Sequence, residues 1–100
     1  MKWKVKYSAS FWKSVEKILK GISRKEREGI ILKLDELATL LQETPYPVHK
    51  FDLRKVVGRE RTEIRVRMGR YRVVYWVLKN ERTIILVGFF RRDEMTYKEK

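Results

Sequence analysis

The chain of 100 residues contains no cysteine and a single histidine, His49. Without cysteine, neither a disulfide framework nor a thiolate metal site can form, and one histidine argues against a zinc centre. No apolar run approaches the roughly 20 residues that span a bilayer, and the first ten residues, MKWKVKYSAS, lack the apolar core of a signal peptide. We therefore expect a cytoplasmic protein that uses no metal, no cofactor and no membrane.

Acidic residues are also scarce, at 13 Asp and Glu against 25 Lys and Arg, so the net charge is +12. Repulsion on this scale opposes compactness and points to a polyanionic partner. Nucleic acid is the first candidate, an acidic protein the second and an anionic membrane surface the third; the alternative is a solvated, charge-rich surface. The length and the 43% of hydrophobic residues predict one globular domain over residues 1–100.

The first half of the chain predicts one strand and two helices. KWKVKY alternates strictly, which is typical of a half-buried strand over residues 2–7. Ser8 or Ser10 can cap a helix that ends near Gly21. Ser23 and Glu26 then form a capping-box pattern that opens a second, longer helix with apolar residues at helical spacing.

The second half predicts strands over residues 62–67, 70–78 and 82–89, with a further edge strand around residues 50–53. The resulting order is strand, helix, helix, strand, strand, strand. We predict an α+β fold in which an antiparallel helical hairpin packs on one face of a twisted, mostly antiparallel sheet. The other face of the sheet is then free.

Residues 65–72, RVRMGRYR, place four arginines on the predicted hairpin. A loop over residues 68–69 or 67–70 pairs Arg65 with Arg72, with Glu63 on their face and with Arg67 and Arg70 near the tip. Like charges across a ladder repel, so an anion is expected between them, and guanidinium groups match phosphate oxygens well. The alternative is a solvated face whose arginine stems cover the sheet. The core side carries Ile64, Val66, Tyr71 and Val73.

Three strings together resemble the RelE/ParE superfamily of small toxins from type II toxin–antitoxin modules, in its RelE-like branch. They are RYRVVY at residues 70–75, LVGFFRR at residues 86–92, and the six-residue spacing from Arg91 to Tyr97. The resemblance extends over essentially the whole chain. It implies ribosome-dependent cleavage of mRNA and neutralisation by a small, partly helical cognate antitoxin. The +12 charge of this chain leads us to expect that the antitoxin is acidic.

Four residues take catalytic roles by this resemblance. Arg72 matches the arginine that contacts the scissile phosphate, and Arg65 matches a lysine position on the same face. Arg91 matches an arginine at the exit of the last strand, and Tyr97 matches a tyrosine that stacks on the substrate base. Glu63 departs from the family pattern, because it stands where other members carry a second catalytic lysine.

Metal-free RNA cleavage by the neighbouring 2′-OH needs a proton acceptor, a proton donor and cations around the phosphorane. Arginines supply the cations but are poor bases. Glu63 is a candidate base, with a salt bridge to Arg65 or Arg72 as the alternative, and Tyr97 or Lys55 are other candidates for proton transfer. The predicted substrate contacts are Arg67, Arg70, Arg92 and Lys55.

Other residues and functions remain open at this stage. Trp76 is either a base platform or a packing residue, and His49 is interpreted as an exposed linker residue. The basic segments at residues 54–55 and 59–61 are either contacts to ribosomal RNA or solvated loops. A ParE-like inhibitor of DNA gyrase and a non-enzymatic RNA-binding module are the alternative functions.

Overall fold

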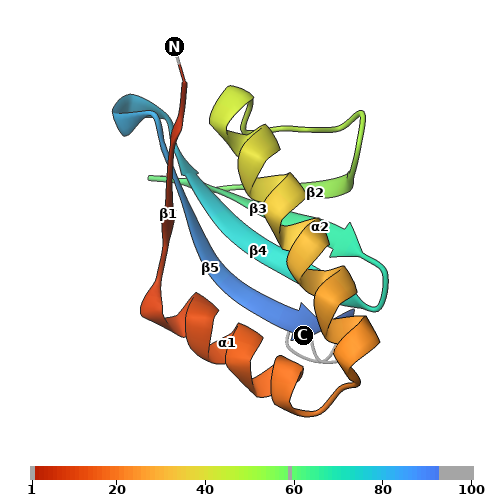
Figure 1. Cartoon of the computed structure of the whole chain (residues 1–100). Coiled ribbons are helices and arrows are strands. Elements are labelled where there is room, and N and C mark those ends of the chain that lie inside the picture. Colours follow the sequence, from red (N-terminus) through yellow and green to blue (C-terminus); the bar gives the residue numbers. More distant parts are fainter. Residues whose placement is uncertain (1, 59, 93–100) are drawn as a thin grey trace.

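The computed structural model describes residues 2–58 and 60–92. Strand β1 (Lys4–Tyr7) is followed by helices α1 (Ala9–Lys20) and α2 (Arg24–Glu43), then by β2 (Asp52–Val57), β3 (Thr62–Met68), β4 (Tyr71–Leu78), a short 3-10 turn (Lys79–Glu81) and β5 (Thr83–Arg91). The strands form one twisted sheet in the order β1-β5-β4-β3-β2 (Figure 1). Only the β1–β5 pair is parallel among these strands, so the predicted α+β architecture is confirmed.

Both helices begin at serines. The Ser8 hydroxyl accepts a hydrogen bond from the backbone N–H of Phe11 at 3.0 Å, and the Ser23 hydroxyl accepts one from Glu26 at 3.2 Å. Each serine thereby satisfies a backbone donor that has no partner within the first helical turn. Ser8, rather than Ser10, is therefore the cap of α1, and the predicted cap of α2 is confirmed.

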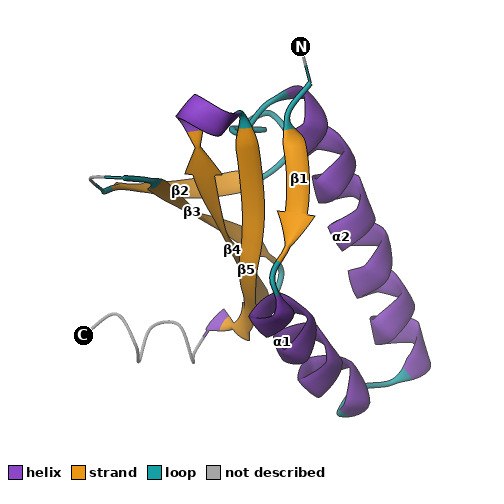
Figure 2. Ribbon diagram, turned by 90° about the vertical axis from the view of Figure 1, so that its left-hand side faces the viewer, coloured by secondary structure: helices purple, strands orange, loops and turns teal. Residues whose placement is uncertain are grey.

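Both helices lie on the same face of the sheet, and no helix of the described residues covers the opposite face, which we call the uncovered face (Figure 2). Helix α1 lies along β5, while α2 diverges from the turn that joins it to α1 and crosses the sheet diagonally (Figure 1). The core lies between the sheet and the helices. It includes the fully buried side chains of Phe11, Leu37, Leu41, Ile64, Val66, Val73, Tyr75, Ile84, Leu86 and Phe89.

The β3–β4 register differs from the predicted one by two residues. Arg67, not Arg65, lies opposite Arg72, and Arg65 lies opposite Val74. The two central residues of the turn are Gly69 and Arg70. Gly69 has a φ of 62°, which is typical of a type II′ turn, and this turn type favours glycine at its first central position. A shift of two residues keeps every side chain on its predicted face, because side chains alternate with a period of two.

Strand β5 contains a β-bulge at Val87. Leu86 lies opposite Tyr75, and Gly88 lies opposite the adjacent residue Val74, so Val87 is the extra residue. The bulge reverses the alternation along β5. Ile84 and Leu86 point toward the helices before the bulge, whereas Phe89 does so after it.

Strand β2 is longer than predicted and begins later, since it covers Asp52–Val57 instead of residues 50–53. It pairs with β3 over its whole length and forms the edge of the sheet. As a result, Arg54 and Lys55 belong to a strand and not to a loop. Their side chains must therefore point to opposite faces of the sheet.

Tyr75, the last residue of the RYRVVY string, has a structural role. Its buried hydroxyl donates a hydrogen bond of 2.6 Å to the carbonyl oxygen of Pro45, which ties the loop after α2 to the middle of the sheet. Burial, the largest cause, raises the pKa of this phenol, and the neighbouring Tyr46 raises it further. Tyr75 therefore stays protonated and serves as an anchor.

The substitution Tyr75→Phe should lower the free energy of unfolding by about 1–3 kcal/mol, because the buried Pro45 carbonyl loses its donor. Thermal or denaturant unfolding measures this loss. Tyr7→Phe is the matched control, since the Tyr7 side chain is half exposed, and its effect should stay within about 0.5 kcal/mol. Equal effects of the two substitutions would contradict the anchoring role of Tyr75.

Candidate functional site

Four arginines from three adjacent strands meet on the uncovered face of the sheet. Arg54 of β2 lies opposite Arg65 of β3, and Arg67 of β3 lies opposite Arg72 of β4. We call Arg54, Arg65, Arg67 and Arg72 the arginine cluster. They line a hollow of about 290 Å³, together with Asp52 and Leu53. The predicted convergence of arginines on one face is confirmed, and Arg54, which sequence analysis had assigned to a basic segment, is a member.

Arg72 lies at the centre of this positive field. Its pKa is lowered, first by burial and then by repulsion from Arg92, Arg54, Arg65 and Arg67. Its Nε is buried and has no hydrogen-bond partner among the described residues. A buried donor without a partner is unfavourable, and so is a cation beside other cations. Both penalties are relieved by an anion that accepts hydrogen bonds from the guanidinium.

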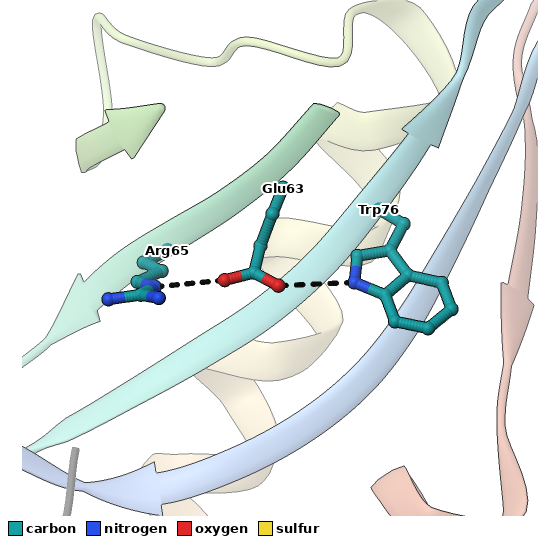
Figure 3. Close-up of polar contacts among 3 residues, drawn as sticks. All are labelled: Glu63, Arg65 and Trp76. Atoms are coloured by element: carbon teal, nitrogen blue, oxygen red, sulfur yellow. Dashed lines mark hydrogen bonds and ion pairs between the residues drawn. The ribbon is translucent and has the colours of Figure 1, made fainter. Parts of the chain in front are cut away.

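Glu63 is held by two partners on the same face (Figure 3). Arg65 donates from Nε to one carboxylate oxygen at 3.0 Å, and Trp76 donates from Nε1 to the other at 3.3 Å. The guanidinium of Arg61 lies 3.7 Å from the centre of the Trp76 ring. This chain of contacts fixes the direction of Arg65 beside the hollow, and it gives Trp76 a packing role.

The two arginines at the end of β5 line one hollow together with Glu26 of α2, but they differ in their relation to Arg72. Arg92 is near enough to Arg72 to lower the pKa of its guanidinium, and its backbone N–H donates to the carbonyl of Arg70 at 2.9 Å. Arg91 instead lies opposite Tyr71, on the side of the helices. The bulge at Val87 is the reason, since strict alternation from Leu86 would have placed Arg91 with Arg72. The expectation that both arginines flank one face is therefore wrong for Arg91.

Two other predicted substrate contacts lie away from the arginine cluster. Lys55 is opposite Ile64, on the helix-covered face, and its Nζ lies 4.9 Å from the centre of the Tyr46 ring. Arg70 belongs to the hairpin turn and lines hollows shared with Glu26 of α2. The predicted loop position of Lys55 is wrong, since it belongs to β2, and Arg70 lies at the hairpin tip as expected; the substrate contacts predicted for both residues stay predictions.

The remaining predictions concern Tyr97, the basic segment at residues 59–61, His49 and membrane-spanning helices. Tyr97 and Arg59 lie outside the described residues. His49 is exposed in the turn before β2. No helix within residues 2–58 and 60–92 is both long enough and apolar enough to cross a bilayer.

Sequence reasoning overlooked Phe90, which the bulge places opposite Arg72 on the uncovered face. Strict alternation assigns this residue to the core, so only the register of β5 reveals it. For Arg54 a signal was present. The alternation of Asp52, Arg54 and Val56 around the half-buried Leu53 is a strand pattern that puts Arg54 on the outer face.

A five-stranded mixed sheet with two helices packed against it is the fold of RelE-like toxins. The chain belongs to the RelE/ParE superfamily of type II toxin–antitoxin toxins: the family described as "ParE toxin of type II toxin-antitoxin system, parDE" matches residues 5–96. A Methanocaldococcus jannaschii protein, provisionally named toxin RelE1, is 34% identical over 89 residues, which cover 89% of this chain and 93% of that protein.

Two solved structures share the fold. One is RelE from the RelE–RelB complex of the archaeon Pyrococcus horikoshii OT3, with a TM-score of 0.69, 26% identity, and coverage of 92% of this chain and 97% of that one. The other comes from the toxin–antitoxin complex RelBE2 of Mycobacterium tuberculosis, with a TM-score of 0.56, 14% identity, and coverage of 92% and 100%. The second likeness is to the fold alone.

Removing the charge of Arg72 should stabilise the free protein, because its lowered pKa means that the folded state disfavours the cation. Arg72→Met keeps an unbranched stem and should raise the free energy of unfolding by about 0.2–1 kcal/mol in low salt without multivalent anions. Arginine is protonated from pH 5 to 9, so this difference should not vary over that range. Thermal unfolding measures it.

Sulfate provides the second half of the test. It should stabilise the wild-type protein more than Arg72→Met, since a ligand of the folded state stabilises it in proportion to its binding. Arg27→Met, at an exposed position of α2, is the control. It should change neither the free energy of unfolding nor the stabilisation by sulfate. If Arg72→Met were destabilising and equally responsive to sulfate, the arginine cluster would not be an anion site.

Proposed function

We propose that this toxin is a metal-independent endoribonuclease that cleaves mRNA on the ribosome. The single observation that carries the proposal is the arginine cluster, with the partly buried Arg72 at its centre. The 34% identity to the protein named RelE1 supports an assignment to the RelE-like branch of the superfamily. The fold shared with a chain of a RelE–RelB complex supports the same assignment.

The proposed reaction begins when the ribose 2′-OH attacks the adjacent phosphorus and loses its proton to a base. The bond to the 5′-oxygen of the next nucleotide then breaks, and that oxygen takes up a proton. The products are a 2′,3′-cyclic phosphate and a 5′-hydroxyl end. Negative charge builds up on the phosphorane oxygens, where Arg72, Arg67 and Arg92 would stabilise it. Positioning by the ribosome supplies a further share of the rate, since orientation alone is worth ~7–11 kcal/mol.

Glu63 acts in this proposal as a positioning residue. Both of its carboxylate oxygens already accept hydrogen bonds, from Arg65 and from Trp76, and the salt bridge directs Arg65 toward the hollow. We keep Tyr97 as the candidate for base stacking or proton transfer, as the family resemblance implies. Arg91 keeps its assignment by resemblance, although its strand position favours Arg92 as the cation nearer to Arg72.

Inhibition of DNA gyrase is the second candidate, because the matching family is described as the ParE toxin of parDE. A supercoiling assay with purified gyrase separates the two functions. The endonuclease predicts normal supercoiling together with new mRNA 3′ ends on ribosomes. The ParE-like function predicts the reverse.

We also propose a small antitoxin as the partner, as in the RelE–RelB and RelBE2 complexes. A groove of about 390 Å³ between α2 and the β3–β4 turn offers an apolar floor that includes Ile30, Phe51 and Met68. Lys33, Lys50 and Arg67 line it as well, which suits an acidic segment with apolar side chains. Arg67 also lines the hollow of the arginine cluster, so a partner in this groove could engage a cation of the candidate active site.

Arg72→Ala should reduce mRNA cleavage about 10²–10³-fold, the usual loss on removing one preorganised charge-stabilising donor. Mapping of mRNA 3′ ends on translating ribosomes gives the rate. Arg27→Ala on α2 is the control and should cleave normally. Intact mRNA with the wild-type toxin, under conditions where its binding to ribosomes has been verified, would refute the endonuclease.

Gly29→Leu should yield a toxin that its partner no longer neutralises. Gly29 lines the groove, and a Cβ at this position meets nothing within 4 Å, so there is space for a side chain to project into the groove. Loss of a mid-helix glycine also stabilises α2 by up to about 1 kcal/mol. The measurement is growth on co-expression with the small gene product that reverses arrest by the wild-type toxin. Arg27→Leu, exposed on the side of α2 opposite Gly29, is the control; full neutralisation of Gly29→Leu would place the partner elsewhere.

A further inference from the structure

Phe90 is an aromatic residue on the uncovered, arginine-rich face of the sheet. The bulge at Val87 brings Gly88 and Phe90 to this face, where Gly88 lies opposite Val74 and Phe90 lies opposite Arg72. Neighbouring strands are about 4.8 Å apart, so the backbone of Phe90 is one strand spacing from that of Arg72. The Phe90 side chain is only partly buried.

Gly88 determines the direction of the Phe90 ring. A Cβ built on Gly88 would lie 2.7 Å from Cζ of Phe90 and closer still to its Cε2, so the ring lies directly over the Gly88 backbone. Glycine inside a strand is otherwise unfavourable and often marks close approach of another group. In this strand that group is the ring of Phe90, which therefore lies along β5 on the face of the arginine cluster.

An aromatic ring beside several guanidinium groups can bind both the base and the phosphate of a nucleotide. Guanidinium groups bind the phosphate, and an aromatic ring stacks on the base, which has an apolar face whatever its identity. Proteins that hold single-stranded RNA combine these two elements. The bulge places Phe90 directly opposite Arg72 on this face, and Gly88 leaves room for the ring.

We propose that Phe90 is a nucleobase-stacking subsite next to the arginine cluster, where it holds a base of single-stranded RNA whose phosphate lies on Arg72. The inference deepens the proposed endonuclease, but it concerns binding and needs no cleavage. The competing role for Phe90 is purely structural, as a cover for Val74, which is only 6% exposed although it lies on the uncovered face. A cover contributes to stability and leaves RNA binding unchanged.

The test uses a six-nucleotide RNA that contains one 2-aminopurine, because the fluorescence of this base falls when it stacks on an aromatic ring. Binding is titrated in low salt with the full chain. The wild-type protein should bind and quench the probe. Phe90→Leu keeps apolar volume but removes the ring, and should bind roughly 5- to 150-fold more weakly, with the quenching lost. Phe90→Trp should retain both signals.

Gly88→Ala provides an independent variant in which residue 90 is still phenylalanine. Its methyl group must displace the ring, so quenching should fall as it does in Phe90→Leu. Trp12→Leu is the matched control, since Trp12 lies on α1 at 53% exposure, and its removal should leave binding and quenching unchanged. Thermal unfolding of each variant checks that the fold persists.

The outcomes separate this inference from the proposed function. Quenching that depends on Phe90, in a protein that cuts no mRNA, would support the subsite and refute the endonuclease. Cleavage of mRNA, with Phe90→Leu binding the probe within twofold of wild type and quenching it equally, would refute the subsite alone. Failure of the wild-type protein to bind the probe would also overturn the inference.

Discussion

Repulsion among guanidinium groups on one side of a sheet is the constraint around which this small protein is organised. The helices cover only the other side, so that side alone builds the core and holds the strands in place. Core packing therefore carries the stability of the sheet, while Arg54, Arg65, Arg67 and Arg72 remain close enough to lower the pKa of Arg72. The fold tolerates an unfavourable charge arrangement, and that arrangement is suited to a polyanion.

Glu63 shows how the same face limits this repulsion. Its carboxylate is shared between Arg65 and Trp76, and Arg61 covers the Trp76 ring. The carboxylate thus neutralises and orders the end of the cluster at Arg65, while the pKa of Arg72 is lowered by burial and by the neighbouring arginines. Positive potential is concentrated where β3, β4 and the end of β5 meet, which is also where Phe90 lies.

Much of the fold could be predicted from the sequence because its strongest signals are periodic. The faces of β3 and β4 were correct despite a register error of two residues, since a shift by an even number leaves each side chain on its side. The faces on which Lys55, Arg70 and Arg91 lie could not be predicted, for a different reason. Each depended on a strand start, a turn position or a bulge, and these depend on backbone pairing that no periodicity encodes. Phe90 was overlooked for the same reason.

The extra residue in β5 has a consequence for how such proteins diversify. Loss of Val87 would remove the bulge and leave the strand end as it is, because Gly88 would then follow Leu86 directly and still lie opposite Val74, with Phe90 opposite Arg72. A strand can therefore gain or lose a single codon at a bulge without any change in the chemistry that it presents to a ligand, because the irregularity absorbs the extra residue. Relatives aligned without attention to this irregularity would be compared at positions that face opposite ways.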